Sequence, residues 1–220
     1  MQYRKEPLEN GQIYHIFNKS IAGFKIFNCE ADYFRIIETI KYYQRYPVPV
    51  RYSELKRLSL PIQQQILINL FNQKKIVEVV AYCLMPTHLH LILKQLAENG
   101  IRILMSNVEN SYARYFNTKY KRKGPLWVGR FKSVFVQNES QLYHLSRYVH
   151  LNPISANLTN KPEEWFYSSY NEYLNNIDNN LRICDYKDII SIKPKTYREF
   201  VESRASYQRQ ISKIKKLMFD

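Results

Sequence analysis

The chain has 220 residues, and its content of 45% hydrophobic and 15% aromatic residues excludes an intrinsically disordered polymer. Its 33 Lys and Arg against 19 Asp and Glu leave a formal net charge of +14, which favours a polyanionic partner. No apolar stretch approaches the roughly 18 residues that span a bilayer, and the N-terminus lacks the apolar core of a signal peptide. We therefore expect a cytoplasmic protein without a membrane partner. The three cysteines are widely spaced, which argues against a disulfide framework or a cysteine-based zinc site.

Apolar periodicity predicts one domain over residues 1–178, built from alternating strands and helices. The strands are expected at 11–18, 76–85, 88–94 and 131–136, and the helices at 30–46, 100–120 and 139–152. The order strand, helix, strand, strand, helix, strand is the split βαβ, ferredoxin-like plan. We therefore expect an α+β fold with a sheet that carries helices on one face, followed by a further helix.

Two segments fall outside this plan. Residues 50–74 are predicted to be a helical insertion, with Pro61 at the start of a helix. Residues 179–220 are predicted to be a basic helical C-terminal tail, in which Thr196–Met218 carries many Lys and Arg and few acidic residues. We expect the chain to be less compact from about Asn175 onward.

A histidine pair, His88 and His90, flanks Leu89 inside an apolar run. Side chains alternate across a strand, so the two imidazoles point to the same face. Two imidazoles on one face are half of a metal site, and a hydrogen-bonded structural pair is the alternative. His15 is expected to be structural.

The segment from Tyr148 to Pro153 supplies a complementary set of side chains. If it is the last turn of a helix that ends before Pro153, Tyr148 and Asn152 share one face. A tyrosine hydroxyl aimed at a metal-bound phosphate is a competent nucleophile, and Asn152 offers an oxygen as a third ligand. A set of imidazoles and an amide oxygen suits Mg²⁺ or Mn²⁺. His150 is a rival ligand, but on a helix it faces away from Tyr148.

A basic segment free of acidic residues extends between Glu109 and Glu139. Cations interleaved with aromatic rings are the expected lining of a groove for single-stranded nucleic acid, whereas a solvated basic face is the alternative. Trp127 is either a stacking residue or a core anchor. The candidate DNA-binding residues are Arg114, Lys119, Lys121, Arg122, Lys123, Trp127, Arg130 and Lys132.

Four motifs in order resemble the single-tyrosine HUH transposases. His88-Leu89-His90 resembles the HUH motif (histidine, bulky hydrophobe, histidine), and it is followed by Leu126–Phe131, Tyr148–Pro153 and Trp165–Tyr170. The sequence is most similar to the REP-associated tyrosine transposases and related domesticated transposases of bacteria. The resemblance covers roughly residues 10–174.

This resemblance implies an enzyme that cleaves and rejoins single-stranded DNA, usually a folded hairpin. Tyr148 would attack the scissile phosphate and form a 5′-phosphotyrosine link, while His88 and His90 hold a divalent metal. Many relatives have Gln four residues after the tyrosine, where this chain has the shorter Asn152. Relatives include monomers and dimers that exchange the tyrosine helix, so a homodimer is left open. A DNA partner implies association with the nucleoid.

Two other functions remain open at this point. A catalytically silent domesticated transposase would keep the basic groove and bind single-stranded or hairpin DNA without turnover. A metal-dependent hydrolase using activated water would need His88 but not Tyr148.

Overall fold

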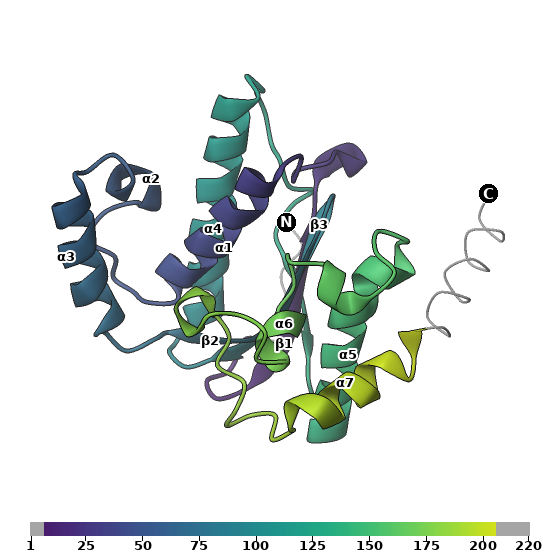
Figure 1. The fold of residues 1–220 in the computed structure, drawn as a ribbon. Coiled ribbons are helices and arrows are strands. Elements are labelled where there is room, and N and C mark those ends of the chain that lie inside the picture. The colour runs from purple at the N-terminus through teal and green to yellow at the C-terminus, as the bar shows by residue number, and fades with distance from the viewer. Residues whose placement is uncertain (1–6, 206–220) are drawn as a thin grey trace.

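Four strands form one antiparallel sheet in the computed structural model, which describes residues 7–205 (Figure 1). The strands are β1 (Ile13–Lys19), β2 (Val77–Met85), β3 (His88–Gln95) and β4 (Lys132–Phe135). Their spatial order is β2-β3-β1-β4, so β2 and β4 lie at the two edges. The predicted α+β class and split βαβ order are confirmed.

Helices cover both faces of this sheet, because β2 and β3 are apolar on both sides. The helices α1 (Glu30–Tyr43) and α4 (Gly100–Lys119) pack on the face that carries Leu89 and Leu91. The helix α5 (Glu139–Ser155) packs on the opposite face, against the side of the sheet that carries Ile92 (Figure 1). The sequence predicted helices on one face of the sheet. This is correct for α1 and α4, whereas α5 lies on the other face.

The helix α5 runs through Pro153 and ends at Ser155, whereas the sequence predicted an end at residue 152. Proline has no N–H, so the carbonyl of Val149 loses its usual helical partner. The side-chain Nδ2 of Asn152 donates to that carbonyl at 3.5 Å instead. The start of α5 is capped, because the Asn138 side chain accepts from the backbone N–H of Gln141.

Residues 50–74 contain α2 (Tyr52–Leu55) and α3 (Leu60–Phe71), and Pro61 lies in the first turn of α3. That this segment is an insertion stays a prediction. These two helices lie at the end of the molecule farthest from α5 and α7 (Figure 1). Leu70 anchors α3 in the core, whereas Ile62 and Ile68 are exposed.

The outer edge of β2 is covered by the segment that follows η2 (Pro162–Glu164). The carbonyl of Tyr167 accepts from the N–H of Leu84, and the N–H of Ser169 donates to the carbonyl of Tyr82. These bonds close an edge that would otherwise expose unpaired backbone groups. The short helix α6 (Tyr170–Tyr173) then leads back across the core.

The described part of the C-terminal tail is packed against the domain. It contains η3 (Asn179–Leu181) and α7 (Pro194–Glu202), and Tyr186, Tyr197 and Val201 are buried beside α5. The expectation of a less compact chain is therefore wrong for this stretch, while the boundary near residue 178 stays a prediction. The predicted helix from Thr196 extends past residue 205, and that part lies outside the described residues. Among the helices of residues 7–205, none has the length and apolarity needed to cross a membrane.

The close approach of α4 to the loop before β2 can be tested at Gly100. A Cβ at Gly100 would clash with the backbone carbonyl of Ile76, which cannot move freely because it accepts from Leu96 and Ala97. We expect Gly100→Ala to lower the free energy of unfolding by about 1–3 kcal/mol, although alanine favours helices. Chemical denaturation measures this change.

Gly129→Ala is the matched control, because a Cβ at Gly129 has no atom within 4 Å. Equal stability of the two alanine variants would contradict the close packing at Gly100.

Candidate functional site

The histidine pair of β3 lies beside β1, and the register of the two strands sets the composition of the site. Lys19 is opposite His88, and Phe17 is opposite His90. Directly paired residues of antiparallel strands share a face, so these four side chains lie on the α5 side of the sheet. His15 is two residues before Phe17 and lies on the same face.

Each imidazole of the pair has one ring nitrogen engaged in a hydrogen bond. Nδ1 of His88 lies 3.0 Å from Oγ1 of Thr87. Nδ1 of His90 lies 3.0 Å from Nε2 of His15. The Nε2 atoms of His88 and His90 are thereby left for another partner.

Burial keeps these histidines unprotonated at neutral pH. It lowers the pKa of His15 to about 4 and, together with the neighbouring His88 and His15, lowers that of His90 to about 3. Burial also lowers the pKa of His88, with a smaller contribution from the ammonium of Lys19. A neutral imidazole offers the lone pair that a metal ion requires.

Tyr148 of α5 faces the histidines of its own chain. Its ring centroid lies 5.8 Å from that of His90 and 6.3 Å from that of His15, and both contacts are edge-on. The side chain is 41% exposed, so its hydroxyl group can be reached from solvent. Tyr148 and His90 of the histidine pair therefore meet within one copy of the chain.

Asn152 lies one turn after Tyr148 and hydrogen-bonds with its side chain. Burial raises the pKa of the Tyr148 phenol, and the hydrogen bond from Asn152 partly opposes this effect. The phenol therefore stays protonated at neutral pH unless a cation approaches it. Asn152 is mostly buried, and its other described contact is to the backbone of α5.

His150 faces away from this site, as the helical spacing predicts. It is fully buried, with Nδ1 at 2.7 Å from the hydroxyl of Tyr197 and Nε2 at 2.7 Å from Oγ of Ser169. Both ring nitrogens are therefore occupied by structural partners. His144 is exposed and contacts Arg147.

The residues at the site fit a divalent cation completed by other ligands. Within residues 7–205, no three His, Cys, Asp or Glu side chains converge as a set that holds a metal ion. Two imidazole nitrogens alone do not make a closed zinc site. They suit an ion such as Mg²⁺ or Mn²⁺, whose remaining ligands are oxygen atoms of an amide, water or phosphate.

Half of the α5 face of the sheet stays open. The helix α5 packs on β2 and β3, whereas β1 and β4 carry half-buried and exposed side chains on this face. Lys132 of β4 is paired with Phe17 and is exposed, and Lys19 is also exposed. A phosphate backbone crossing this open half would pass between two ammonium groups and the histidines.

The structure supports the core-anchor role for Trp127. Its ring is 8% exposed and lies near Tyr112, and its indole N–H donates to the carbonyl of Glu109 at 3.1 Å. The Trp127 ring therefore anchors the loop after α4 in the core. The guanidinium of Arg122 likewise donates to the carbonyls of Gly124 and Pro125 and so shapes the same loop.

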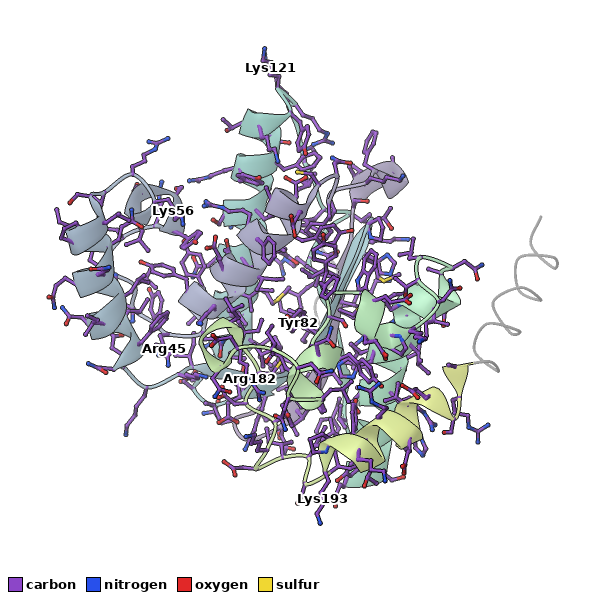
Figure 2. The ribbon with its side chains drawn as sticks, viewed as in Figure 1. Arg45, Lys56, Tyr82, Lys121, Arg182 and Lys193 are labelled. Atoms are coloured by element: carbon purple, nitrogen blue, oxygen red, sulfur yellow. The ribbon has the colours of Figure 1, made fainter. Side chains whose placement is uncertain are left out.

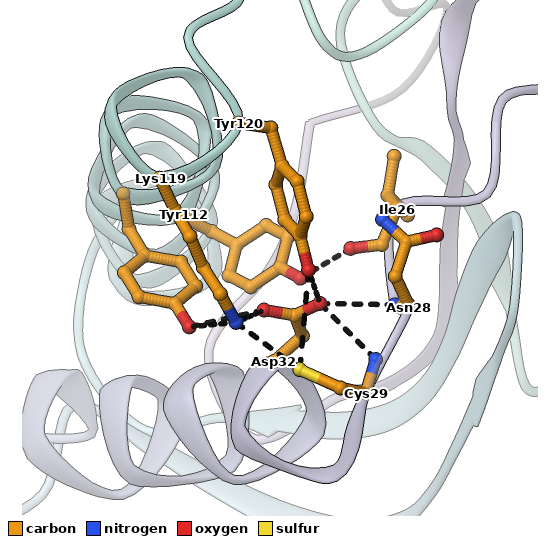
Figure 3. A network of polar contacts seen from close by, with 8 residues as sticks. Ile26, Asn28, Cys29, Asp32, Tyr112, Lys119 and Tyr120 are labelled. Atoms are coloured by element: carbon orange, nitrogen blue, oxygen red, sulfur yellow. Dashed lines mark hydrogen bonds and ion pairs between the residues drawn. The ribbon is translucent and has the colours of Figure 1, made fainter.

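Lys119 belongs to a polar network between α1 and α4 (Figure 3). Its ammonium lies 2.6 Å from a carboxylate oxygen of the fully buried Asp32. Although burial alone would raise it, hydrogen bonds from Lys119 and Tyr120 hold the pKa of Asp32 below its usual value. The charge of Lys119 is thus already compensated inside the protein, which makes it a poor phosphate ligand.

The other predicted DNA-binding residues are exposed. Lys121 projects from the tip beyond α4, away from the body of the molecule (Figure 2). Besides Lys119, the exposed members of the predicted set are Arg114, Lys121, Lys123, Arg130 and Lys132.

The loop that carries Trp127 is fixed to the sheet by a carboxyl group that the sequence did not single out. Asn18 donates to Oε1 of Glu109 at 2.8 Å and to the carbonyl of Gly129 at 3.0 Å. Burial raises the pKa of Glu109 to about 7, with an opposing contribution from the hydrogen bond of Asn18. An acidic residue at the border of a basic segment was the only sequence signal for this role.

Comparison with known proteins places this geometry in a family context. Residues 44–152 match the model of the IS200-like transposases. A curated protein of Haemophilus influenzae, named as a REP-associated tyrosine transposase, is 30% identical over 42% of this chain. The match spans 58% of the length of that relative.

The fold has a counterpart among solved structures. A REP-associated tyrosine transposase bound to a REP hairpin superposes with a TM-score of 0.51 at 15% identity. The superposition covers 83% of this chain and 88% of the other. At this level of identity, the likeness concerns the fold.

The role of Glu109 predicts a pH-dependent stability. A carboxyl whose folded pKa is raised stabilises the fold fully below its unfolded pKa near 4.5, and this contribution is lost as the pH rises through about 7. Glu109→Gln imitates the protonated form, so it should match the wild type at pH 4 and be more stable by about 3 kcal/mol at pH 8. Denaturant titrations across this range measure the difference.

Glu98→Gln, which removes an exposed carboxylate just before α4, is the matched control for the loss of one negative charge. A Glu109→Gln variant that is less stable than the wild type at pH 8 would mean that the ionised carboxylate supports the loop.

Proposed function

This chain belongs, through residues 44–152, to the family of IS200-like transposases, and we propose that it cleaves and rejoins single-stranded DNA through a 5′-phosphotyrosine intermediate. One observation carries the proposal. Tyr148 lies beside His90 of the same chain, at the edge of an open and basic sheet face. A nucleophile, a candidate metal pair and a path for a polyanion are thus combined at one place.

The proposed nucleophile is the Tyr148 hydroxyl group. It attacks the scissile phosphorus, a P–O bond forms to the phenol oxygen, and the 3′-hydroxyl of the other DNA fragment leaves. The phosphotyrosine preserves the energy of the broken bond, so a 3′-hydroxyl can attack in turn and restore the strand. Because burial raises the pKa of the phenol, its proton must leave as positive charge approaches the oxygen.

The proposed metal ligands are Nε2 of His88, Nε2 of His90 and the side-chain oxygen of Asn152, with Mg²⁺ or Mn²⁺ as the ion. When bound, the cation would polarise the phosphoryl oxygen and stabilise negative charge in the transition state. The protein contributes the orientation. Thr87 and His15 hold the two rings by their Nδ1 atoms, and Asn152 contacts the nucleophile.

The proposed substrate is hairpin or single-stranded DNA. Its support is the net charge of +14 and the exposed cations Lys19 and Lys132 on the site face. The solved relative named above is bound to a REP hairpin, which is the same class of ligand. We propose that Lys121, Lys123 and Arg114 contact DNA outside the site, whereas Lys119 serves the fold.

The proposed reaction needs one copy of the chain at a time, because Tyr148 meets histidines of its own chain. A homodimer stays a prediction that this geometry does not require.

The nucleophile is tested with a labelled DNA hairpin and Mn²⁺. We expect Tyr148→Phe to abolish the covalent protein–DNA adduct and the cleavage product, while hairpin binding stays within about twofold, because only the hydroxyl is removed. Denaturing electrophoresis and filter binding measure the two properties. Tyr143→Phe, on the same helix but outside the site, should form the adduct at the wild-type level.

The other outcomes identify the other functions. Turnover that survives Tyr148→Phe but is lost in His88→Ala would identify a hydrolase that uses water. Wild-type protein that binds the hairpin without any adduct in Mg²⁺ or Mn²⁺ would identify a silent DNA-binding protein.

The proposed path of the DNA is tested by the salt dependence of hairpin binding. Lys132→Gln should weaken hairpin binding uniformly across sequences and reduce the slope of log K against log salt by about 0.7–0.9, the value for one lost phosphate contact. Lys56→Gln changes a lysine that is also exposed but lies next to α2, at the end of the molecule far from α5 (Figure 2). An equal loss in both variants would contradict a defined path across β4.

A further inference from the structure

His15 lies outside the residues that match the family model, and neither the model nor the sequence resemblance assigns it a role. It is on β1, opposite Ile92 of β3, and it is half-buried on the site face. Its Nε2 atom lies 3.0 Å from Nδ1 of His90. A histidine that contacts a candidate ligand in this way is either a third ligand or a support for the ligand.

The relative position of the two rings separates these roles. Two imidazoles joined head-on by an N–H···N bond of this length place their centroids about 5.3 Å apart. Two imidazoles that bind one ion with bonds of about 2.1 Å, through nitrogens 3.0 Å apart, subtend about 90° at the ion and place their centroids about 4.6 Å apart. The observed separation is 5.2 Å, with 20° between the ring planes. The geometry is that of a hydrogen bond.

We propose that His15 is a positioning residue that accepts a hydrogen bond from Nδ1–H of His90 and thereby fixes the tautomer in which Nε2 of His90 binds the divalent cation. This inference rests on the proposed function. The reverse arrangement, in which His15 donates, would leave a proton on Nε2 of His90 and block the ion. The direction of one hydrogen bond thus decides whether His90 is a ligand.

Two aromatic neighbours restrict the orientation of the His15 ring. Phe17 packs beside its ring at 5.1 Å between centroids, and the edge of the Tyr148 ring lies on another side. Both neighbours limit rotation of the His15 ring, so its Nε2 atom stays directed at His90. Partners of this kind typically change metal affinity 10- to 100-fold when they are removed.

The test compares two polar substitutions that differ in reach. The side chain of His15→Gln can place an amide oxygen near the position of Nε2, whereas that of His15→Asn is too short to reach His90. Mn²⁺ binding to the full chain without DNA is measured from the loss of the free Mn²⁺ signal in electron paramagnetic resonance. We expect 10- to 100-fold weaker binding in His15→Asn and less than 5-fold weaker binding in His15→Gln. His144→Asn, on the exposed side of α5, should bind as the wild type does.

Three results would overturn the proposal. Wild-type affinity in His15→Asn would mean that the hydrogen bond has no effect on the ion. Equal losses in the Asn and Gln variants, with one fewer nitrogen coupled to Mn²⁺ in pulsed measurements, would make His15 a direct ligand. If His88→Ala binds Mn²⁺ as tightly as the wild type does, the proposed metal site as a whole is wrong. That result contradicts the proposed function, whereas the first two results contradict only the positioning role of His15.

Discussion

The packing of α5 against β2 is the constraint on which the candidate site depends. Val149 and Leu151 of α5 are fully buried in the core that includes Cys83 of β2, and this contact fixes both the height and the rotation of the helix. Rotation by one residue would move Tyr148 by about 100° around the helix axis, away from the histidines. His150 adds a polar restraint from the opposite side of the helix, because it bonds to both Tyr197 and Ser169. The described part of the C-terminal tail therefore helps to hold α5, and with it Tyr148, in place.

Local patterns in the sequence predicted the elements and their order, but not their layering. The apolar run around His88 and the spacing of α1, α4 and α5 carry strong periodic signals, and the resulting split βαβ order is confirmed. The placement of α5 on the second face followed from burial on both sides of β2, which a continuous apolar run does not specify. The passage of α5 through Pro153 was also not predictable, because it depends on a side-chain bond from Asn152 that compensates the missing N–H.

For the candidate site too, local sequence patterns predicted some features, whereas others depend on how the strands and helices pack. Tyr148, His88 and His90 were identified because their spacing is local: two residues along a strand and one position on a helix. His15 and Lys19 were not, since their proximity to the pair depends on the register of β1 against β3. Trp127 and Lys119 show the converse, because residue types suited to DNA binding also suit a core anchor and an ion pair to a buried carboxylate. Composition places charge and aromatic rings in a segment, but only packing decides which of them face solvent.

The one-sided coverage of the site face follows from a balance between stability and access. If α5 also covered β1 and β4, His15 and Phe17 would be buried completely, and the added burial would stabilise the fold. The same coverage would also bury the ammonium groups of Lys19 and Lys132, and burying a charge without a partner is costly. The polar residues on β1 and β4 therefore keep α5 on the β2 side of the face. By doing so they keep Tyr148 at the border between the packed half and the open half, where its ring contacts His90 and its side chain stays 41% exposed.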